Sequence, residues 1–178
     1  MKSTEVYREA RMVLGPWCKS QGFKRTQGGM LGWQKQVEQK WLTFWLQCSQ
    51  HGWDTYAGSE FVVEFQLSAN SCVGDGGPEC FRHRLPFFLH QEELEEVRQI
   101  QNDVIGALPR PPADYFVLQM SPDVVNWYLA NFAPVERSFV QTDDIWLRYH
   151  QPHHVRRWSA FLLQVLPGIT TVLTAQAV

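Results

Sequence analysis

The segment Trp41-Leu42-Thr43-Phe44-Trp45-Leu46-Gln47-Cys48-Ser49 is patterned as a β-strand and organises the rest of the chain around it. Side chains alternate between the two faces of a strand. One face would carry four apolar residues, Leu42, Phe44, Leu46 and Cys48. The other face carries Trp41 and Trp45. We therefore expect a central strand covered on both faces, because large aromatic residues usually enter the core first. The alternative is an open Trp41–Trp45 face, which would mark a binding surface.

Similar segments lie on either side of this strand. Residues 30–37 and 60–68 also alternate apolar and polar side chains, which predicts two further strands. The short connection at 38–40 suits a hairpin, whereas the loop at 50–59 is longer and contains two glycines. A fourth strand is expected at 79–85. The pattern predicts an antiparallel meander of four or more strands.

The remaining sequence is mostly helical. Apolar residues at spacings of three and four predict helices at 4–21, at 91–108, from Ser121 onward, and at 154–165. Pro16 would kink the first helix or divide it in two. A short strand is expected at 145–149, and the tail at 170–178 would be either an edge strand or loose. Helices packed mainly on one face of an antiparallel sheet give an α+β fold.

Bulk composition indicates one globular domain spanning residues 1–178. The chain is 44% hydrophobic and 19% charged, with 16 Lys and Arg against 18 Asp and Glu. This balance argues against general nucleic-acid binding, because such domains usually carry a basic surplus. No run reaches the roughly 20 apolar residues of a membrane helix, and the charged start does not resemble a secretory signal. We therefore expect a cytoplasmic protein whose four cysteines are reduced.

Catalytic, metal and cofactor motifs are absent from the sequence. There is no Gly-x-Ser-x-Gly elbow, P-loop or dinucleotide fingerprint. Cys72, Cys80 and His83 are close in sequence but do not match a zinc spacing. His153 and His154 are adjacent, so in a helix their side chains diverge by about 100°. We predict no catalytic residue, no metal and no cofactor.

Binding candidates come from two places in the sequence. In the loop at 50–59, Trp53 and Tyr56 are flanked by glycines and are not needed for either strand's alternation. Such aromatic residues on a loop between rigid strands often anchor a partner. The second candidate is a small-ligand pocket near Gln47, Ser49 and the pair Arg82 and Arg84; a separate anion-binding patch would combine Lys24 and Arg25 with Arg82, His83 and Arg84.

The first half of the chain resembles a known bacterial family. Gly22-Phe23-Lys24-Arg25, then a strand ending in Gln47-Cys48-Ser49, then a strand beginning at Phe61, is similar to the domain of unknown function 4304. The resemblance covers residues 4–85. It implies a bacterial origin and the fold of this family, and it carries no activity over to this chain.

Two functions follow from these patterns. The first is a non-catalytic protein-binding module of the immunity or accessory kind, indicated by the aromatic loop and by the lack of catalytic signatures. The alternative is an enzyme or small-ligand binder with a pocket near Gln47, Ser49, Arg82 and Arg84. A deep pocket with converging polar groups would favour the second, and a flat aromatic patch would favour the first.

Overall fold

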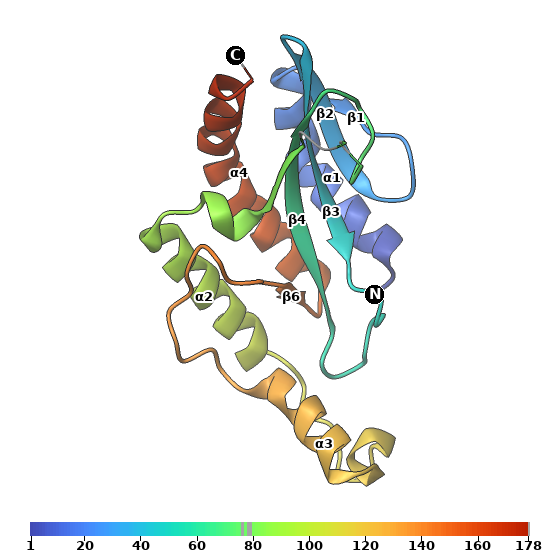
Figure 1. Ribbon diagram of the computed structural model, residues 1–178. Helices are drawn as coiled ribbons and strands as arrows, with labels where there is room; N and C mark the ends of the chain where they lie inside the picture. The colour runs from blue at the N-terminus through green and yellow to red at the C-terminus, as the bar shows by residue number, and fades with distance from the viewer. Residues whose placement is uncertain (76, 78–79, 178) are drawn as a thin grey trace.

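A computed structural model describes residues 1–75, 77 and 80–177, and it has the expected α+β architecture (Figure 1). Within these residues six strands form one antiparallel sheet: β1 (Lys24–Arg25), β2 (Leu31–Val37), β3 (Lys40–Cys48), β4 (Ser59–Ser68), β5 (Phe81–Arg84) and β6 (Leu147–Tyr149). The α-helices are α1 (Ser3–Ser20), α2 (Gln91–Gly106), α3 (Pro122–Leu129) and α4 (Pro152–Ala175). Three short 3-10 helices are η1 (Leu85–Phe88), η2 (Phe116–Gln119) and η3 (Ala130–Phe132).

The sheet is a meander from β1 to β5, and β3 lies at its centre. β4 is the longest strand, and it pairs with other strands along both of its edges. One edge pairs with β3, while the other pairs with β5 near Glu64 and with β6 near Glu60. β6 comes from far along the sequence, so it closes the sheet by bringing residues 147–149 beside the start of β4.

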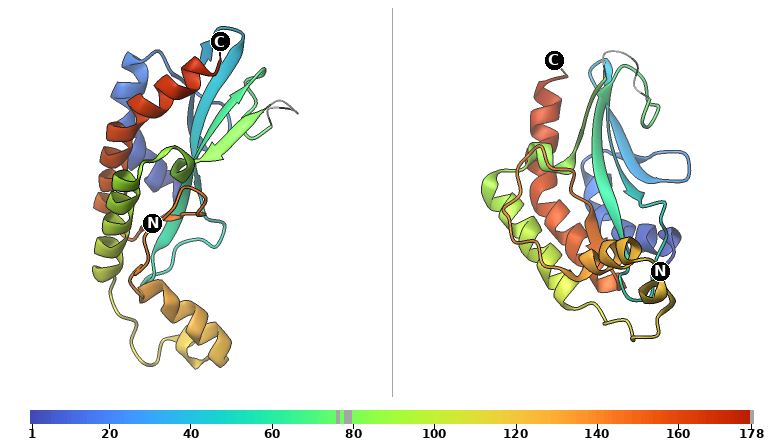
Figure 2. Two further views of the ribbon diagram at one scale, coloured as in Figure 1. Left: turned by 60° about the vertical axis from the view of Figure 1, so that its left-hand side comes forward. Right: turned by 60° about the horizontal axis from the view of Figure 1, so that its bottom comes forward.

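One face of the sheet is covered by α1, α2 and α4 (Figure 2). This agrees with the expected packing of helices mainly on one face. Phe44 is fully buried at the centre of this inner face. Its ring lies 5.5 Å from that of Phe23, 5.2 Å from Trp33 and 5.8 Å from Phe65. Aromatic pairs at these separations add to the free energy of burying the rings. The alternation that marked the 41–49 segment therefore places its aliphatic and phenylalanine side chains in the main core.

The two tryptophans of β3, Trp41 and Trp45, lie on the outer face of the sheet. Trp45 is fully buried and Trp41 is half-buried. The guanidinium of Arg82 lies 5.1 Å from the Trp45 ring, and Arg82 Nε donates a 2.7 Å hydrogen bond to Glu64. Side chains of β4 and β5 thus cover this face over β3. The open-face alternative is wrong for Trp45, which has no surface to offer a partner.

Two helix predictions need correction, one for the first helix and one for the last. α1 is one helix with Pro16 inside it, so the predicted division into two helices is wrong, and its buried stripe, which includes Leu14 and Cys18, continues past the proline. α4 continues through Pro167 to Ala175, so the strand or loose tail expected at 170–178 is wrong as far as residue 177. Val165, Ile169 and Leu173 keep one buried stripe across Pro167, and this packing outweighs the single lost hydrogen bond.

α4 is also long and apolar enough to cross a membrane by length and composition, contrary to the expectation from sequence. Half of its most apolar stretch is buried inside the fold, against α1 and the sheet. Core helices of compact domains meet the same criteria, so this helix is weak evidence for a membrane span.

Residues 109–133 form a small lobe that projects from one end of the molecule (Figure 1). We call this segment the α3 lobe; it contains η2, α3 and η3. α3 begins at Pro122 after Ser121, as expected. The lobe has its own apolar cluster, separate from the main core: Ala57, Leu108, Val117, Tyr128 and Phe132. Ala57 belongs to the loop between β3 and β4, so this loop packs directly against the lobe.

Candidate functional site

Asp54, in the loop between β3 and β4, ties the α3 lobe to the sheet. Its Oδ2 accepts a 2.6 Å hydrogen bond from the Tyr115 hydroxyl, and its Oδ1 accepts a 2.9 Å bond from the Tyr128 hydroxyl. Oδ1 also accepts bonds from the backbone N–H groups of Tyr56 and Ala57, at 2.8 and 2.7 Å. The short sequence Asp54-Thr55-Tyr56 is a turn that an aspartate side chain commonly closes in this way. One carboxylate therefore fixes both the loop and the lobe.

The hydrogen bonds to Asp54 favour the ionised form of its carboxylate. Burial acts to raise the pKa of Asp54, but the hydrogen bonds from Tyr115, Ala57, Tyr56 and Tyr128 outweigh it and lower that pKa below its ordinary value. The same contact raises the pKa of Tyr115 to about 12, because the Tyr115 hydroxyl donates to Asp54. Both tyrosines therefore remain protonated donors at neutral pH.

A cavity of about 300 Å³ opens between this loop and the α3 lobe. The lobe supplies an apolar wall that includes Val117, Met120 and Trp127. The sheet supplies the opposite, polar wall, which includes Ser49 and Arg148. The volume lies at the small end of the range for ligand pockets, roughly 300–1,000 Å³, so the cavity suits one residue-sized group.

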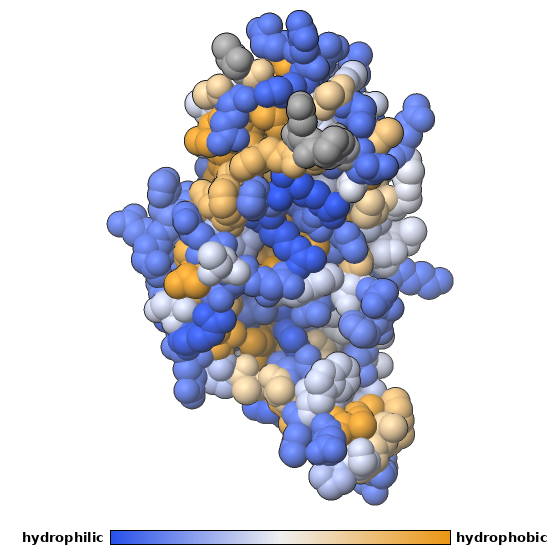
Figure 3. All heavy atoms as spheres, in the orientation of Figure 1, coloured by the Kyte–Doolittle hydropathy of each residue, from blue (hydrophilic) through white to orange (hydrophobic). Residues whose placement is uncertain are grey.

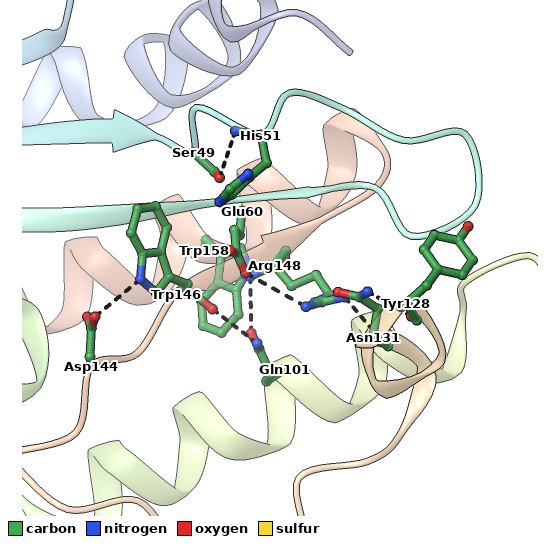
Figure 4. A network of polar contacts seen from close by, with 10 residues as sticks. All are labelled: Ser49, His51, Glu60, Gln101, Tyr128, Asn131, Asp144, Trp146, Arg148 and Trp158. Atoms are coloured by element: carbon green, nitrogen blue, oxygen red, sulfur yellow. Dashed lines mark hydrogen bonds and ion pairs between the residues drawn. The ribbon is translucent and has the colours of Figure 1, made fainter. Parts of the chain in front are cut away.

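Arg148, on β6, is the principal charge on the polar wall (Figure 4). Its Nη1 donates to the carbonyl and the side-chain oxygen of Asn131, at 3.1 and 2.9 Å. Its Nη2 lies 3.7 Å from Glu60 Oε2, which is beyond hydrogen-bonding distance. Its Nε is buried and has no hydrogen-bond partner among the described residues. The guanidinium is thus only partly compensated.

The backbone of Arg148 is held rigidly by two helices. Its N–H donates to Gln101 of α2 at 3.1 Å, and its carbonyl accepts a 2.7 Å bond from the Trp158 indole of α4 (Figure 4). Burial lowers the pKa of Arg148, and the nearby Glu60 partly offsets this. Arginine stays charged even so, because the ordinary pKa of a guanidinium lies far above neutral pH. The fold therefore keeps a fixed, poorly solvated cation beside the cavity.

Ser49, His51 and Glu60 lie together at the polar wall, yet they do not form a catalytic relay (Figure 4). In the described residues the hydrogen bond between Ser49 and His51 runs from the His51 backbone N–H to the Ser49 hydroxyl, at 3.3 Å. A nucleophile is activated by a side-chain base, not by a backbone donor. The arrangement suits binding and does not show an activated serine.

The α3 lobe carries an exposed apolar surface beside the cavity (Figure 3). Four of its large apolar side chains are exposed by 43–67%: Phe116, Met120, Trp127 and Leu129. Met120 and Trp127 also line the cavity. Apolar side chains gathered on a projecting element usually mark an interaction site. We call these four residues the lobe surface.

The aromatic loop residues predicted from sequence lie at this end of the molecule, in different environments. Trp53 is 38% exposed, and its ring stacks on that of His150 with centroids 5.6 Å apart. Tyr56 is half-buried, and its ring packs on Tyr115 at 4.8 Å. The loop borders the cavity, whereas Tyr56 serves mainly to seat the lobe.

Replacing Trp53 tests how far this loop contributes to stability. Because the ring is partly exposed and makes one stacking contact, we expect Trp53→Ala to lower the free energy of unfolding by about 1 kcal/mol. A fully buried tryptophan would cost about 3–5 kcal/mol. Urea denaturation of the two proteins measures the difference. A loss of 3 kcal/mol or more would show that Trp53 is a core residue.

The predicted polar pocket is not assembled. Arg84 pairs with Glu64 and Asp144, and Arg82 pairs with Glu64, all near the middle of β4. Ser49 lies opposite Glu60, four residues farther along β4, or about 13 Å at 3.3 Å per residue. Ser49 lines the cavity described above, whereas Gln47, Arg82 and Arg84 are not among the residues that line it.

Sequence reasoning missed Arg148, Asn131 and the lobe surface. Arg148 enters the site through the pairing of β6 with β4, which no local pattern reveals. Trp127 lies in the helix expected from Ser121 onward, but its exposure depends on how that helix packs. In the part of the chain that the structure describes, no group of three or more His, Cys, Asp or Glu residues is placed to hold a metal.

Comparison of the chain with protein-family models, with curated proteins and with solved structures gave no match. The resemblance to the domain of unknown function 4304 therefore stays a prediction. The class of site rests on the geometry alone: an exposed apolar surface adjoining a residue-sized cavity with an arginine on one wall.

Proposed function

We propose that this chain is a non-catalytic protein-binding module that docks a partner on the α3 lobe. The observation that carries the proposal is the lobe surface: four large apolar side chains are exposed on one small lobe, and two of them, Met120 and Trp127, line the same cavity. Burial of apolar area drives most protein association, and tryptophan is enriched among the residues that dominate it. Trp127, exposed by 65%, is the expected anchor.

The attachment of the lobe supports this function. Asp54 holds the lobe by hydrogen bonds from Tyr115 and Tyr128, so the surface is presented in one orientation. A rigid surface loses less conformational entropy on binding than a mobile one. An apolar surface held in this way would be costly to keep in water without a partner to cover it.

Small-ligand binding is the second candidate, and the cavity beside Arg148 favours it. A ligand of this volume would leave Phe116 and Leu129 uncovered, since neither lines the cavity. A protein partner covers the lobe surface and the cavity mouth together, which is why we place it first.

Site-specific photo-cross-linking in the native cells tests the docking proposal. A photoreactive residue at position 120 should capture a defined protein, while the same residue at position 12 should not. Met12 is a matched control because it is 63% exposed, against 53% for Met120, and lies on α1. Equal capture at both positions, or capture at position 12 alone, would contradict docking on the lobe.

A further inference from the structure

The cavity has one apolar wall and one wall that carries a positive charge, and a bound group must complement both. Its lobe wall is apolar, through Val117, Met120 and Trp127, and its sheet wall carries the cation of Arg148. A ligand that fills it therefore needs an apolar part and, within the length of one residue, a group that complements a guanidinium. A carboxylate makes a stronger, charge-assisted hydrogen bond to a guanidinium than a neutral acceptor does.

Arg148 has hydrogen-bonding capacity left for such a group. Among the described residues, Nη1 alone donates to protein acceptors, both on Asn131, while Nη2 has Glu60 at 3.7 Å. Taking a cation out of water is costly unless it is paired and hydrogen-bonded. A carboxylate bound at Nη2 would supply the missing hydrogen bond.

Glu60 is the competing charge in the cavity. Its side chain is 30% exposed, so it can turn toward water when another carboxylate takes its place. The other acid on the cavity wall, Asp54, has its oxygens occupied by Tyr115, Tyr128 and two backbone N–H groups. The positive charge of Arg148 is thus offset mainly by the negative charge of Glu60. A substitution can remove that charge, so Glu60 is a useful position for a test.

We propose that the cavity receives the C-terminal residue of the docked protein, with its apolar side chain against Trp127 and its terminal carboxylate against Arg148. A C-terminal residue carries both groups on one Cα, whereas an internal acidic side chain brings the carboxylate without the apolar part. Capture of a chain terminus is a recurrent mode of peptide recognition. This inference rests on the proposed protein-binding function and specifies which part of the partner is read.

Three probe peptides separate the chemistries: acetyl-Ala-Ala-Phe with a free carboxylate, the same peptide as its amide, and acetyl-Phe-Asp-Ala amide. We expect NMR titration to show binding of the free acid with shifts at the Trp127 indole and Arg148. The amide should bind at least about tenfold more weakly, since it lacks the charge-assisted hydrogen bond. Equal binding of the acid and the amide, or stronger binding of the internal aspartate peptide, would overturn the proposal.

Two variants test whether the charges in the cavity determine the affinity for the free acid. Glu60→Gln removes the competing carboxylate, so it should tighten binding of the free acid by about threefold to tenfold. Weaker binding by this variant would contradict the assignment, because it would mean that Glu60 contacts the ligand as an acceptor. Arg84→Gln is the control, since Arg84 pairs with Glu64 and Asp144 and should leave the affinity unchanged.

The failure of this inference is distinguishable from the failure of the proposed function. If no peptide binds while position 120 still cross-links a partner, the lobe docks a protein that does not insert its terminus. If position 120 captures nothing and the free acid binds, the cavity is a carboxylate site and docking on the lobe surface is wrong.

Discussion

Replacement of Asp54 by alanine should release the α3 lobe from the sheet. The substitution removes the acceptor for the Tyr115 and Tyr128 hydroxyls and for two backbone N–H groups. Losing hydrogen bonds to a charged group, with donors left unpaired, should cost about 2–4 kcal/mol of the free energy that holds the lobe. Limited proteolysis should cut the variant in residues 109–113 much faster than the wild type.

The matched control is Asp114→Ala, which makes the same change at an exposed position in the lobe. We expect its cleavage rate to equal that of the wild type. Equal cleavage of Asp54→Ala and Asp114→Ala would show that the apolar cluster around Tyr128 holds the lobe without the carboxylate.

The lobe should also loosen in acid. The pKa of Asp54 is lower in the folded protein than its ordinary value of 3.8, so its contribution to stability is fully present above that value. The contribution is lost as the pH falls through the folded pKa, below about pH 4. Cleavage in 109–113 measured with an acid-active protease should therefore rise in this range for the wild type. Asp54→Ala should show no such rise, because it has no carboxylate to protonate there.

Replacement of Trp127 by alanine should remove most of the affinity for the docked protein and little of the stability. The side chain is 65% exposed, so the free energy of unfolding should change by about 0.5 kcal/mol or less. As the anchor of an interface, it should contribute about 2 kcal/mol or more, a loss of roughly thirtyfold in Kd. Calorimetric titration with the cross-linked partner measures Kd, and urea denaturation measures stability.

Met12→Ala is the control for that titration. Met12 is as exposed as Trp127 but lies on α1, and its removal should change Kd by less than about twofold. If Met12→Ala weakens binding as much as Trp127→Ala does, the partner contacts apolar surface in general and the lobe has no special role.

The sheet was predictable because its strands have strong local patterns. β2, β3 and β4 follow the alternation of 30–37, 41–49 and 60–68, and the apolar stripe of 91–108 becomes α2. Pro16 misled because a local rule gives the cost of a proline but not the tertiary packing that offsets it. β1, with two residues, is too short for any periodicity to reveal.

The candidate site was only partly predictable, because some of its residues are brought together by long-range strand pairing. The loop between β3 and β4 stood out by its aromatic residues, and it does border the cavity. Arg82 and Arg84 drew attention as adjacent charges, yet both are used in ion pairs on the outer face of the sheet. Arg148 was passed over because its position depends on β6 joining β4 across more than eighty residues, a contact that no local pattern encodes.

Hydrogen exchange of the backbone amides tests the central claim, docking on the α3 lobe, most directly. In the complex with its captured partner, amides of η2 and α3, near Met120 and Trp127, should exchange more slowly than in the free protein. Amides of α1 around Met12 should be unchanged, because that surface stays in water. Slowed exchange at α1 or on the outer face of the sheet, with the lobe unaffected, would contradict the account.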